Sequence, residues 1–176
     1  MARYDTDDQA LIHGAPDEVW SALLREFAGE THWWLPELEF RQLQRPAVPA
    51  VGTEIEVVPH VRGERWLPFS LAFVARVVEL IENERLIVEY VRGAYLGRGE
   101  WLLEPVGEGT RLRTRWQVRS HGLLPSLSGL AVKAGAIHSQ MMRSGFHRLD
   151  VLLTAAPPPL GEPTSAAPAG AAKGGR

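Results

Sequence analysis

The chain has 176 residues, a formal net charge of −2 and no cysteine. Its length suits one folded domain, and with 45% hydrophobic residues it can bury a sizeable core. The lack of cysteine excludes disulfide bonds, thiolate nucleophiles and zinc-thiolate sites. The nearly balanced charge gives no electrostatic reason to expect a nucleic-acid partner.

The two ends of the chain carry no signal for a membrane. The start, MARYDTDDQAL, lacks the basic and then apolar order of a signal peptide, and no apolar run approaches the ~20 residues of a membrane span. We therefore expect a soluble, cytoplasmic protein without integral membrane association. Residues 156–176 are rich in Pro, Ala and Gly without periodicity, which is typical of disorder. The predicted organisation is one folded domain over residues 1–155, followed by a disordered tail.

The first elements are predicted to be a strand and two short helices. After a strand near Tyr4–His13, Pro16 suits the first turn of a helix, and the two acids behind it favour the positive end of that helix. Apolar residues then recur at helical spacing until Gly29, a residue that suits a helix end. A second short helix is predicted around Thr31–Leu35, and Pro36 limits its extension.

The middle of the chain is predicted to form successive antiparallel strands joined by turns. A strand begins near Leu38, and three more are expected over Val51–Val61, Phe69–Ile81 and Leu86–Arg92. The clearest strand pair is Tyr95–Arg119, because its second strand follows a period of two. One face of that strand carries Arg111, Arg113, Arg115 and Arg119, and the other carries Thr110, Leu112, Thr114, Trp116 and Val118.

This alternation predicts the register of the hairpin, with Gly107 and Glu108 as its two-residue turn. The ion pairs expected on the wet outer face are Glu104 with Arg111 and Glu100 with Arg115. The pairs expected on the buried face are Leu103 with Leu112, Trp101 with Thr114, and Gly99 with Trp116. Because Gly97 and Gly99 weaken a strand unless a bend or close approach is needed, we expect this sheet to curl.

The segment from about Pro125 to Thr154 is predicted to be the dominant helix. A spacing of 100° per residue predicts its inner face as Leu127, Ala131, Ala134, His138, Met141, Met142, Gly145, Leu149 and Leu152. Ala, Gly and Met dominate the middle of this face, where a close-packed core normally places larger side chains. The small residues predict a hollow between the helix and the sheet.

This order of elements, together with APDEVWSALLREF, THWWLP, GRGEWLLEP and GTRLRTRWQV, resembles the START-like (SRPBCC) superfamily and its polyketide cyclase/dehydrase-like branch. The resemblance covers about Asp5–Thr154 and rests on the pattern of elements and on loose motifs, without a catalytic signature. It implies an α+β helix-grip fold, in which a seven-stranded antiparallel sheet wraps around the long C-terminal helix and encloses a hydrophobic pocket. Family members bind lipids, sterols, polyketides or other apolar ligands, and some catalyse cyclisation or dehydration.

Aromatic side chains are the first candidates for the wall of such a pocket. Trp20 and Trp116 are expected in the core. Trp33 and Trp34 are adjacent in a short segment and are not expected to point inward together, so at least one is predicted at the pocket mouth. The residues predicted to contact a ligand are Trp33, Trp34, Trp66, Phe73, Tyr95, Trp101, Ala134, His138 and Met141.

His138 lies near the middle of the helix's inner face, where an imidazole can hydrogen-bond a ligand or move a proton near neutral pH. The alternative is a core histidine whose ring is satisfied by a neighbouring hydroxyl or carbonyl. No Asp or Glu partner can be identified from the sequence, which favours this structural role, and pocket contact over catalysis. No catalytic residue is assigned.

Other chemistry has no supporting motif. The remaining histidines lack metal-ligand spacing such as H-E-x-x-H, and the serines lack a nucleophile elbow, so neither a metal nor a triad is expected. The glycines of LGRGE and PVGEGT lack the Lys and helix context of a phosphate loop. We expect no cofactor, and we expect the outer arginines to pair with acids instead of binding nucleic acid.

Three functions are consistent with these residues. The first is binding of a small hydrophobic ligand, lipid-, polyketide- or aromatic-like, in a cavity between the sheet and the C-terminal helix. The second is a polyketide cyclase or dehydratase-type enzyme that uses the same cavity, with His138 or Tyr95 as the acid-base group. The third is a protein-interaction module that exposes an apolar patch of Trp33, Trp34 and Leu35. A small apolar ligand is the expected partner, and the sequence does not set the oligomeric state.

Overall fold

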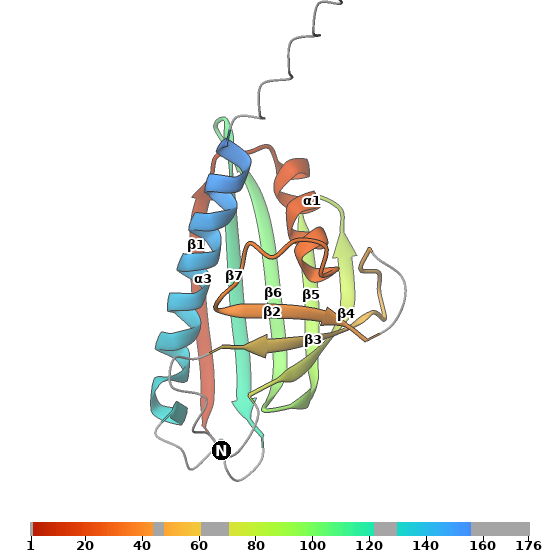
Figure 1. Cartoon of the computed structure of the whole chain (residues 1–176), viewed down its shortest axis with the longest axis vertical. Helices are drawn as coiled ribbons and strands as arrows, with labels where there is room; N and C mark the ends of the chain where they lie inside the picture. The colour runs from red at the N-terminus through yellow and green to blue at the C-terminus, as the bar shows by residue number, and fades with distance from the viewer. Residues whose placement is uncertain (1, 44–47, 61–70, 122–129, 156–176) are drawn as a thin grey trace, which may run out of the picture.

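The structure is a computed structural model that describes residues 2–43, 48–60, 71–121 and 130–155. The elements are β1 (Arg3–Ile12), α1 (Pro16–Phe27), β2 (Leu38–Gln42), β3 (Glu54–Pro59), β4 (Phe73–Ile81), β5 (Arg85–Gly93), β6 (Tyr95–Val106), β7 (Gly109–Ser120) and α3 (Leu130–Thr154). They form one curled seven-stranded sheet with α1 and α3 on the same side of it (Figure 1). The predicted α+β helix-grip fold is therefore confirmed. The tail expected at residues 156–176 lies outside the described residues.

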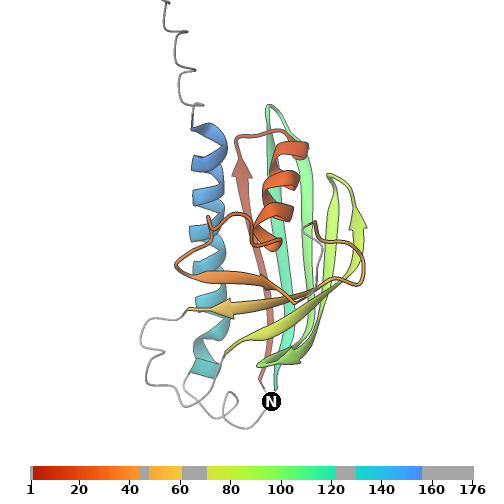
Figure 2. The same ribbon diagram turned by 45° about the vertical axis from the view of Figure 1, so that its right-hand side comes forward.

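The sheet is antiparallel throughout, in the order β1-β7-β6-β5-β4-β3-β2. It bends so strongly that β2 and β3 run across the direction of the other strands (Figure 2). Two register shifts in β4–β5 accompany the bend, and Gly97 has a φ of 149° at a point where a Cβ would overlap the neighbouring backbone of β7. The expectation that glycines let this sheet curl is met at Gly97.

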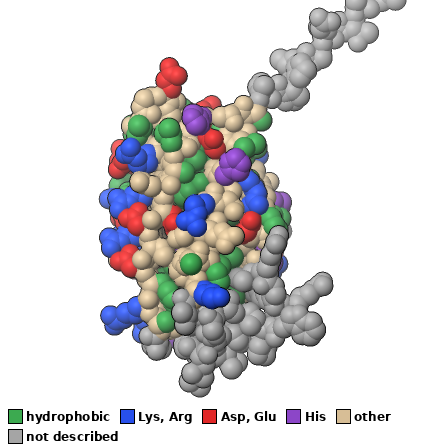
Figure 3. Space-filling view, turned by 90° about the vertical axis from the view of Figure 1, so that its left-hand side faces the viewer, with side chains coloured by type: hydrophobic (Ala, Val, Ile, Leu, Met, Phe, Trp, Pro, Cys, Tyr) green, Lys and Arg blue, Asp and Glu red, His purple; other side chains and the backbone are tan. Residues whose placement is uncertain are grey.

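The register predicted for the β6–β7 hairpin is confirmed at every pair that was named. Its outer face carries charged side chains, and a view from the side of β1 and α3 shows basic and acidic groups interleaved along the left edge of the molecule (Figure 3). The ion pairs here are Arg111 with Glu104, Arg113 with Asp7 and Arg115 with Asp5. Glu100 lies opposite Arg115 as predicted, but the ion pair expected between them is wrong. Asp5 on the adjacent β1 instead accepts two hydrogen bonds from the guanidinium of Arg115, at 2.9 and 3.1 Å.

The second short helix expected at Thr31–Leu35 is wrong, because residues 33–37 form turns. The carboxylate of Glu26, buried near the end of α1, accepts hydrogen bonds from the backbone N–H of Trp33 (3.1 Å) and of Trp34 (3.0 Å). The same carboxylate accepts a 2.8 Å bond from the hydroxyl of Thr31. The two backbone N–H groups therefore donate to the Glu26 side chain and not to the backbone carbonyls that a helix would offer. Burial raises the pKa of Glu26, although the three hydrogen bonds oppose that shift.

The expectation that Trp33 and Trp34 do not both point inward is also wrong. Both are buried, and their rings stack with centroids 4.6 Å apart. In a turn, adjacent side chains are not forced onto opposite faces as they are in a strand. The exposed Trp33–Trp34 patch of the interaction hypothesis is therefore absent, and of its three members Leu35 alone is exposed.

Helix α3 presents most of its predicted inner face to the sheet. Buried there are Ala134, Met141, Met142, Gly145 and Leu149, with His138 partly buried. Leu152 was predicted wrongly: its side chain is 48% exposed, and the next residue, Leu153, packs against the core beside Gly14. Phe146, which was not predicted, is fully buried. Leu127 and the side chain of Ala131 lie outside what the structure describes.

Gly145 provides the space into which Trp34 fits. A Cβ at Gly145 would lie 2.8 Å from Cδ1 of Trp34 and closer still to its indole nitrogen. That nitrogen donates a 3.1 Å hydrogen bond to the backbone carbonyl of Met141 on the same helix. Because Gly145 has no side chain, the indole of Trp34 can pack against α3 and link the turn after α1 to this helix.

Gly145→Ala is expected to destabilise the fold by about 2 to 3 kcal/mol, because the added methyl displaces the indole and breaks its bond to Met141. Gly135→Ala is the matched control on the same helix. Its Cβ would lie 3.4 Å from Cγ2 of Thr6, and Ala favours a helix over Gly by up to about 1 kcal/mol. Denaturant unfolding of both variants measures the difference. Equal stability of the two variants would contradict the role given to Gly145.

Candidate functional site

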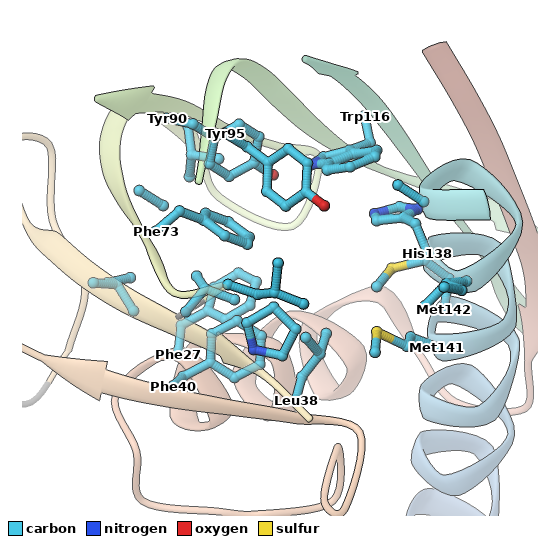
Figure 4. Close-up of a pocket in the computed structure, with 18 of the residues that line it drawn as sticks. Phe27, Leu38, Phe40, Phe73, Tyr90, Tyr95, Trp116, His138, Met141 and Met142 are labelled. Carbon is cyan, nitrogen blue, oxygen red and sulfur yellow. The ribbon is translucent and has the colours of Figure 1, made fainter. Parts of the chain in front are cut away.

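A cavity of about 80 Å³ lies between the concave side of the sheet and α3. Its wall is mostly apolar and combines side chains from α1, from strands β2 to β7 and from α3 (Figure 4). The aromatic members of the wall are Phe27, Phe40, Phe73, Tyr90, Tyr95, Trp101 and Trp116. A concave space with an aromatic wall is the usual setting for an apolar small molecule.

The volume of the cavity limits what fits without rearrangement. An engineered apolar cavity of ~150 Å³ admits benzene, so about 80 Å³ holds less than one aromatic ring as the side chains now stand. Met141 and Met142 both line the space, and unbranched thioethers adapt to new shapes more easily than other apolar side chains. A ring-sized ligand therefore requires side chains such as these to move.

The structure brings together six of the nine residues predicted to contact a ligand. Those that line the cavity are Phe73, Tyr95, Trp101, Ala134, His138 and Met141. Trp33 and Trp34 lie in the core and do not line the cavity. The ring of Trp34 packs edge-on against Trp101, with ring centroids 5.4 Å apart. Trp66 lies outside the described residues. Trp116, expected in the core, is buried and also lines the cavity.

The polar groups of the cavity gather at one end. Figure 4 shows His138 at the same end as Tyr90, Tyr95 and Trp116, across the open space from Phe27 and other apolar side chains. The cavity therefore has one apolar end and one end with polar handles.

The two tyrosines of this end supply hydroxyl groups. Tyr90 lies over Gly99, where a Cβ would come within 2.9 Å of Cζ and closer still to the hydroxyl. Neither the Tyr90 nor the Tyr95 hydroxyl has a hydrogen-bond partner among the described residues. Burial raises the pKa of Tyr90, and burial with a smaller contribution from Tyr4 raises the pKa of Tyr95 to about 12. Both groups therefore stay protonated and can donate a hydrogen bond near neutral pH.

His138 is held between an aromatic ring and β1. Its imidazole stacks on Trp116 with ring centroids 4.4 Å apart and an interplanar angle of 7°. On the other side, its Nδ1 lies 3.1 Å from Oγ1 of Thr6 and 3.4 Å from Oδ2 of Asp8. Asp8 is buried and also accepts a 2.9 Å hydrogen bond from the hydroxyl of Ser139. The acidic partner that the sequence did not identify is therefore Asp8.

One signal in the sequence points to Thr6 and Asp8. They are two residues apart in β1, so a period of two places both side chains on one face of the strand. Polar residues on an inward face need partners. That the partner is His138, 130 residues away from Asp8, follows only from the position of α3 beside β1.

The protonation of the pair follows from its surroundings. Burial lowers the pKa of His138, and the hydrogen bond and charge of Asp8 oppose this in part. Burial raises the pKa of Asp8, but the hydrogen bonds from His138 and Ser139, with the charges of His138 and Arg143, hold it below its ordinary value. The Thr6 hydroxyl can donate to Nδ1 or accept from it, but the ionised carboxylate of Asp8 only accepts, so it favours the tautomer of the neutral imidazole with its proton on Nδ1. In that tautomer Nε2 is an acceptor.

Neither a metal site nor a membrane span is found in the described part of the chain. No three His, Asp or Glu side chains there are grouped so that they could hold a metal ion. No helix within it is both long and apolar enough to cross a membrane.

Comparison with known proteins identifies the fold. No protein-family model matches the sequence, and no curated protein matches it. A START superfamily protein from Mycobacterium smegmatis has a similar structure, with a TM-score of 0.62, 14% identity, and coverage of 85% of this chain and 96% of that one. The protein TTHA0849 from Thermus thermophilus is similar with a TM-score of 0.59, 17% identity, and coverage of 83% and 97%.

The di-domain ARO/CYC protein BexL, from the BE-7585A biosynthetic pathway, is similar over half of its length. The TM-score is 0.62 at 14% identity, covering 89% of this chain and 52% of that chain. At such identities the likeness concerns the fold alone. The chain has the START-like fold that its sequence resembles.

The imidazole of His138 is expected to titrate below 6.5, and Asp8→Asn is expected to lower its pKa further, since Asp8 is the group that opposes the effect of burial. NMR titration of the histidine ring measures both values. Because the folded pKa lies below the unfolded one, the unfolded chain binds more protons, and stability falls as the pH drops below about 6.5. Thr6→Val, which removes a neighbouring hydroxyl and no charge, is the control. A higher pKa in Asp8→Asn would contradict this account.

Proposed function

We propose that this protein binds a small hydrophobic ligand, lipid-, polyketide- or aromatic-like, in the cavity between the sheet and α3. The observation that carries the proposal is an aromatic-walled hollow between the sheet and α3, with its few polar groups at one end. The START-like fold supports it, because one protein of this fold is described as an ARO/CYC protein of a biosynthetic pathway.

Removal of apolar surface from water supplies most of the affinity. At ~25 cal/mol per Å², burying about 250 Å² of ligand contributes roughly 6 kcal/mol before the costs of ordering. Opening a cavity of about 80 Å³ to admit a ring reduces this gain. Met141 and Met142 keep that cost low because they can change rotamer without losing apolar contact.

The polar end orients the ligand. An apolar body packs against Phe27 and Phe40, and a polar group at its other end reaches Tyr90, Tyr95 and His138. A ligand that is apolar throughout leaves these polar groups unpaired, which costs affinity.

The alternative function is a cyclase or dehydratase-type enzyme that uses the same cavity. Asp8 beside His138 favours it, because a carboxylate that orients an imidazole is an arrangement for moving protons. Conversion of a bound compound to a new product by the purified protein is the result that distinguishes the enzyme from a binding protein.

Ala134→Leu is expected to weaken binding of the neutral fluorescent probe N-phenyl-1-naphthylamine by about tenfold or more, because the larger side chain fills the cavity. Ala136→Leu makes the same change on an exposed position of α3 and is expected to bind as the unmodified protein does. Fluorescence titration gives the affinities, and circular dichroism verifies that both variants are folded. Unweakened binding to Ala134→Leu would place the ligand elsewhere. Native mass spectrometry of gently purified protein tests in addition for a copurifying ligand.

A further inference from the structure

We infer that His138 selects ligands that carry a hydroxyl group on an aromatic ring, with Nε2 accepting the hydroxyl proton and Asp8 positioning the imidazole. The inference rests on the proposed binding function and adds the chemical class of the ligand.

The first step concerns which ring nitrogen is free. Nδ1 of His138 faces Oγ1 of Thr6 at 3.1 Å and Oδ2 of Asp8 at 3.4 Å, so this nitrogen is engaged away from the cavity. Asp8 is itself fixed by Ser139 at 2.9 Å. Since the carboxylate only accepts and the Thr6 hydroxyl can accept as well, the two favour the proton on Nδ1, and in that tautomer Nε2 accepts and does not donate. The ring lines the cavity, and Figure 4 shows it projecting from α3 toward the open space.

The second step concerns the groups near the imidazole. The ring of Tyr95 packs edge-on against Trp116 at 5.1 Å, and the imidazole stacks on the same indole at 4.4 Å. Tyr95 and Tyr90 keep their protons, so they donate into the cavity. The polar end thus offers one obligatory acceptor, Nε2, beside hydroxyl donors.

The third step compares ligand groups by what they satisfy. A hydroxyl donates to Nε2 of His138 and at the same time accepts from Tyr95 or Tyr90. A ketone or an ether accepts a hydrogen bond from a tyrosine but leaves Nε2 without a donor. A carboxylate also has no proton to donate to Nε2, and its charge is repelled by the nearby charge of Asp8. An ammonium group can donate but loses its hydration in an apolar cavity. The hydroxyl is therefore the group that fits.

The fourth step concerns the ring. The wall places aromatic side chains edge-on to one another, as in Phe73 against Tyr90 (5.1 Å) and against Tyr95 (5.6 Å). Such a wall offers both edges and faces to a further ring and favours a flat aromatic body over a flexible chain.

The test compares 2-naphthol with 2-methylnaphthalene, which differ by a hydroxyl in place of a methyl group. Both are titrated by fluorescence against the unmodified protein and against His138→Phe, at a pH where histidine is neutral. Phe keeps a ring that can stack on Trp116 but has no nitrogen. The ratio of the two dissociation constants is expected to shift by about tenfold toward 2-methylnaphthalene in His138→Phe. The ratio within one protein cancels any general loss of packing.

Asp8→Asn is expected to shift the ratio in the same direction by less, because Asn can donate as well as accept and no longer fixes the proton on Nδ1. Nitrogen-15 NMR of the imidazole gives a readout that a merely structural role would not move. In the unmodified protein it is expected to show Nδ1 protonated, and in Asp8→Asn a mixture of tautomers. Ala136→Leu, on the exposed face of α3, is expected to leave the ratio unchanged.

An unchanged ratio in His138→Phe, with both compounds still bound, would overturn the inference while the proposed binding function stands. Failure of the unmodified protein to bind either compound would remove the proposed function and this inference together. If His138→Phe does not fold, the nitrogen-15 shift of Nε2 in the unmodified protein decides: it moves with 2-naphthol and not with 2-methylnaphthalene if Nε2 accepts the hydroxyl proton. Equal shifts with the two compounds would overturn the inference.

Discussion

The position of the Trp34 indole in the notch at Gly145 is the contact on which the arrangement of this domain depends. The indole nitrogen bonds the carbonyl of Met141, and the ring packs against Trp101 in the sheet, so one side chain joins α3 to the sheet. Its backbone N–H is held in turn by the carboxylate of Glu26 on α1. A buried indole in full contact with its surroundings leaves α3 little freedom to move closer to the sheet or away from it.

The small residues of α3 consequently have two different effects. At Gly145 the ring of Trp34 fills the space that a side chain would take, so the helix and the sheet are close-packed there. Near Ala134 the structure describes no side chain that takes the same place, and the cavity lies there. With the helix fixed by the tryptophan at one end, the sheet cannot collapse onto Ala134 at the other. The hollow is therefore a consequence of the packed half of the same helix.

Much of this could be predicted from the sequence where the information is local. The period of two in β6 and β7 was sufficient for their register, and the period of α3 was sufficient for most of its inner face. The turn at residues 33–37 could not be predicted in the same way, because Glu26 is one polar residue in an amphipathic helix until its carboxylate is seen to bind the backbone that follows. The pairing of Asp8 with His138 is less predictable still, since it joins two residues through the packing of the whole sheet.

The polar end of the cavity is not what stability alone would select. Burying the carboxylate of Asp8 beside a neutral imidazole costs desolvation that apolar side chains of similar size would avoid. Ser139 donates a hydrogen bond to Asp8, and the hydroxyl of Thr6 lies within hydrogen-bond distance of Nδ1 of His138. The hydroxyls of Tyr90 and Tyr95, in contrast, have no partners among the described residues. Where a local rule of packing is broken at a cavity, with no compensation among the residues that the structure describes, function is the usual reason. The missing hydrogen bonds are those that a bound molecule would supply.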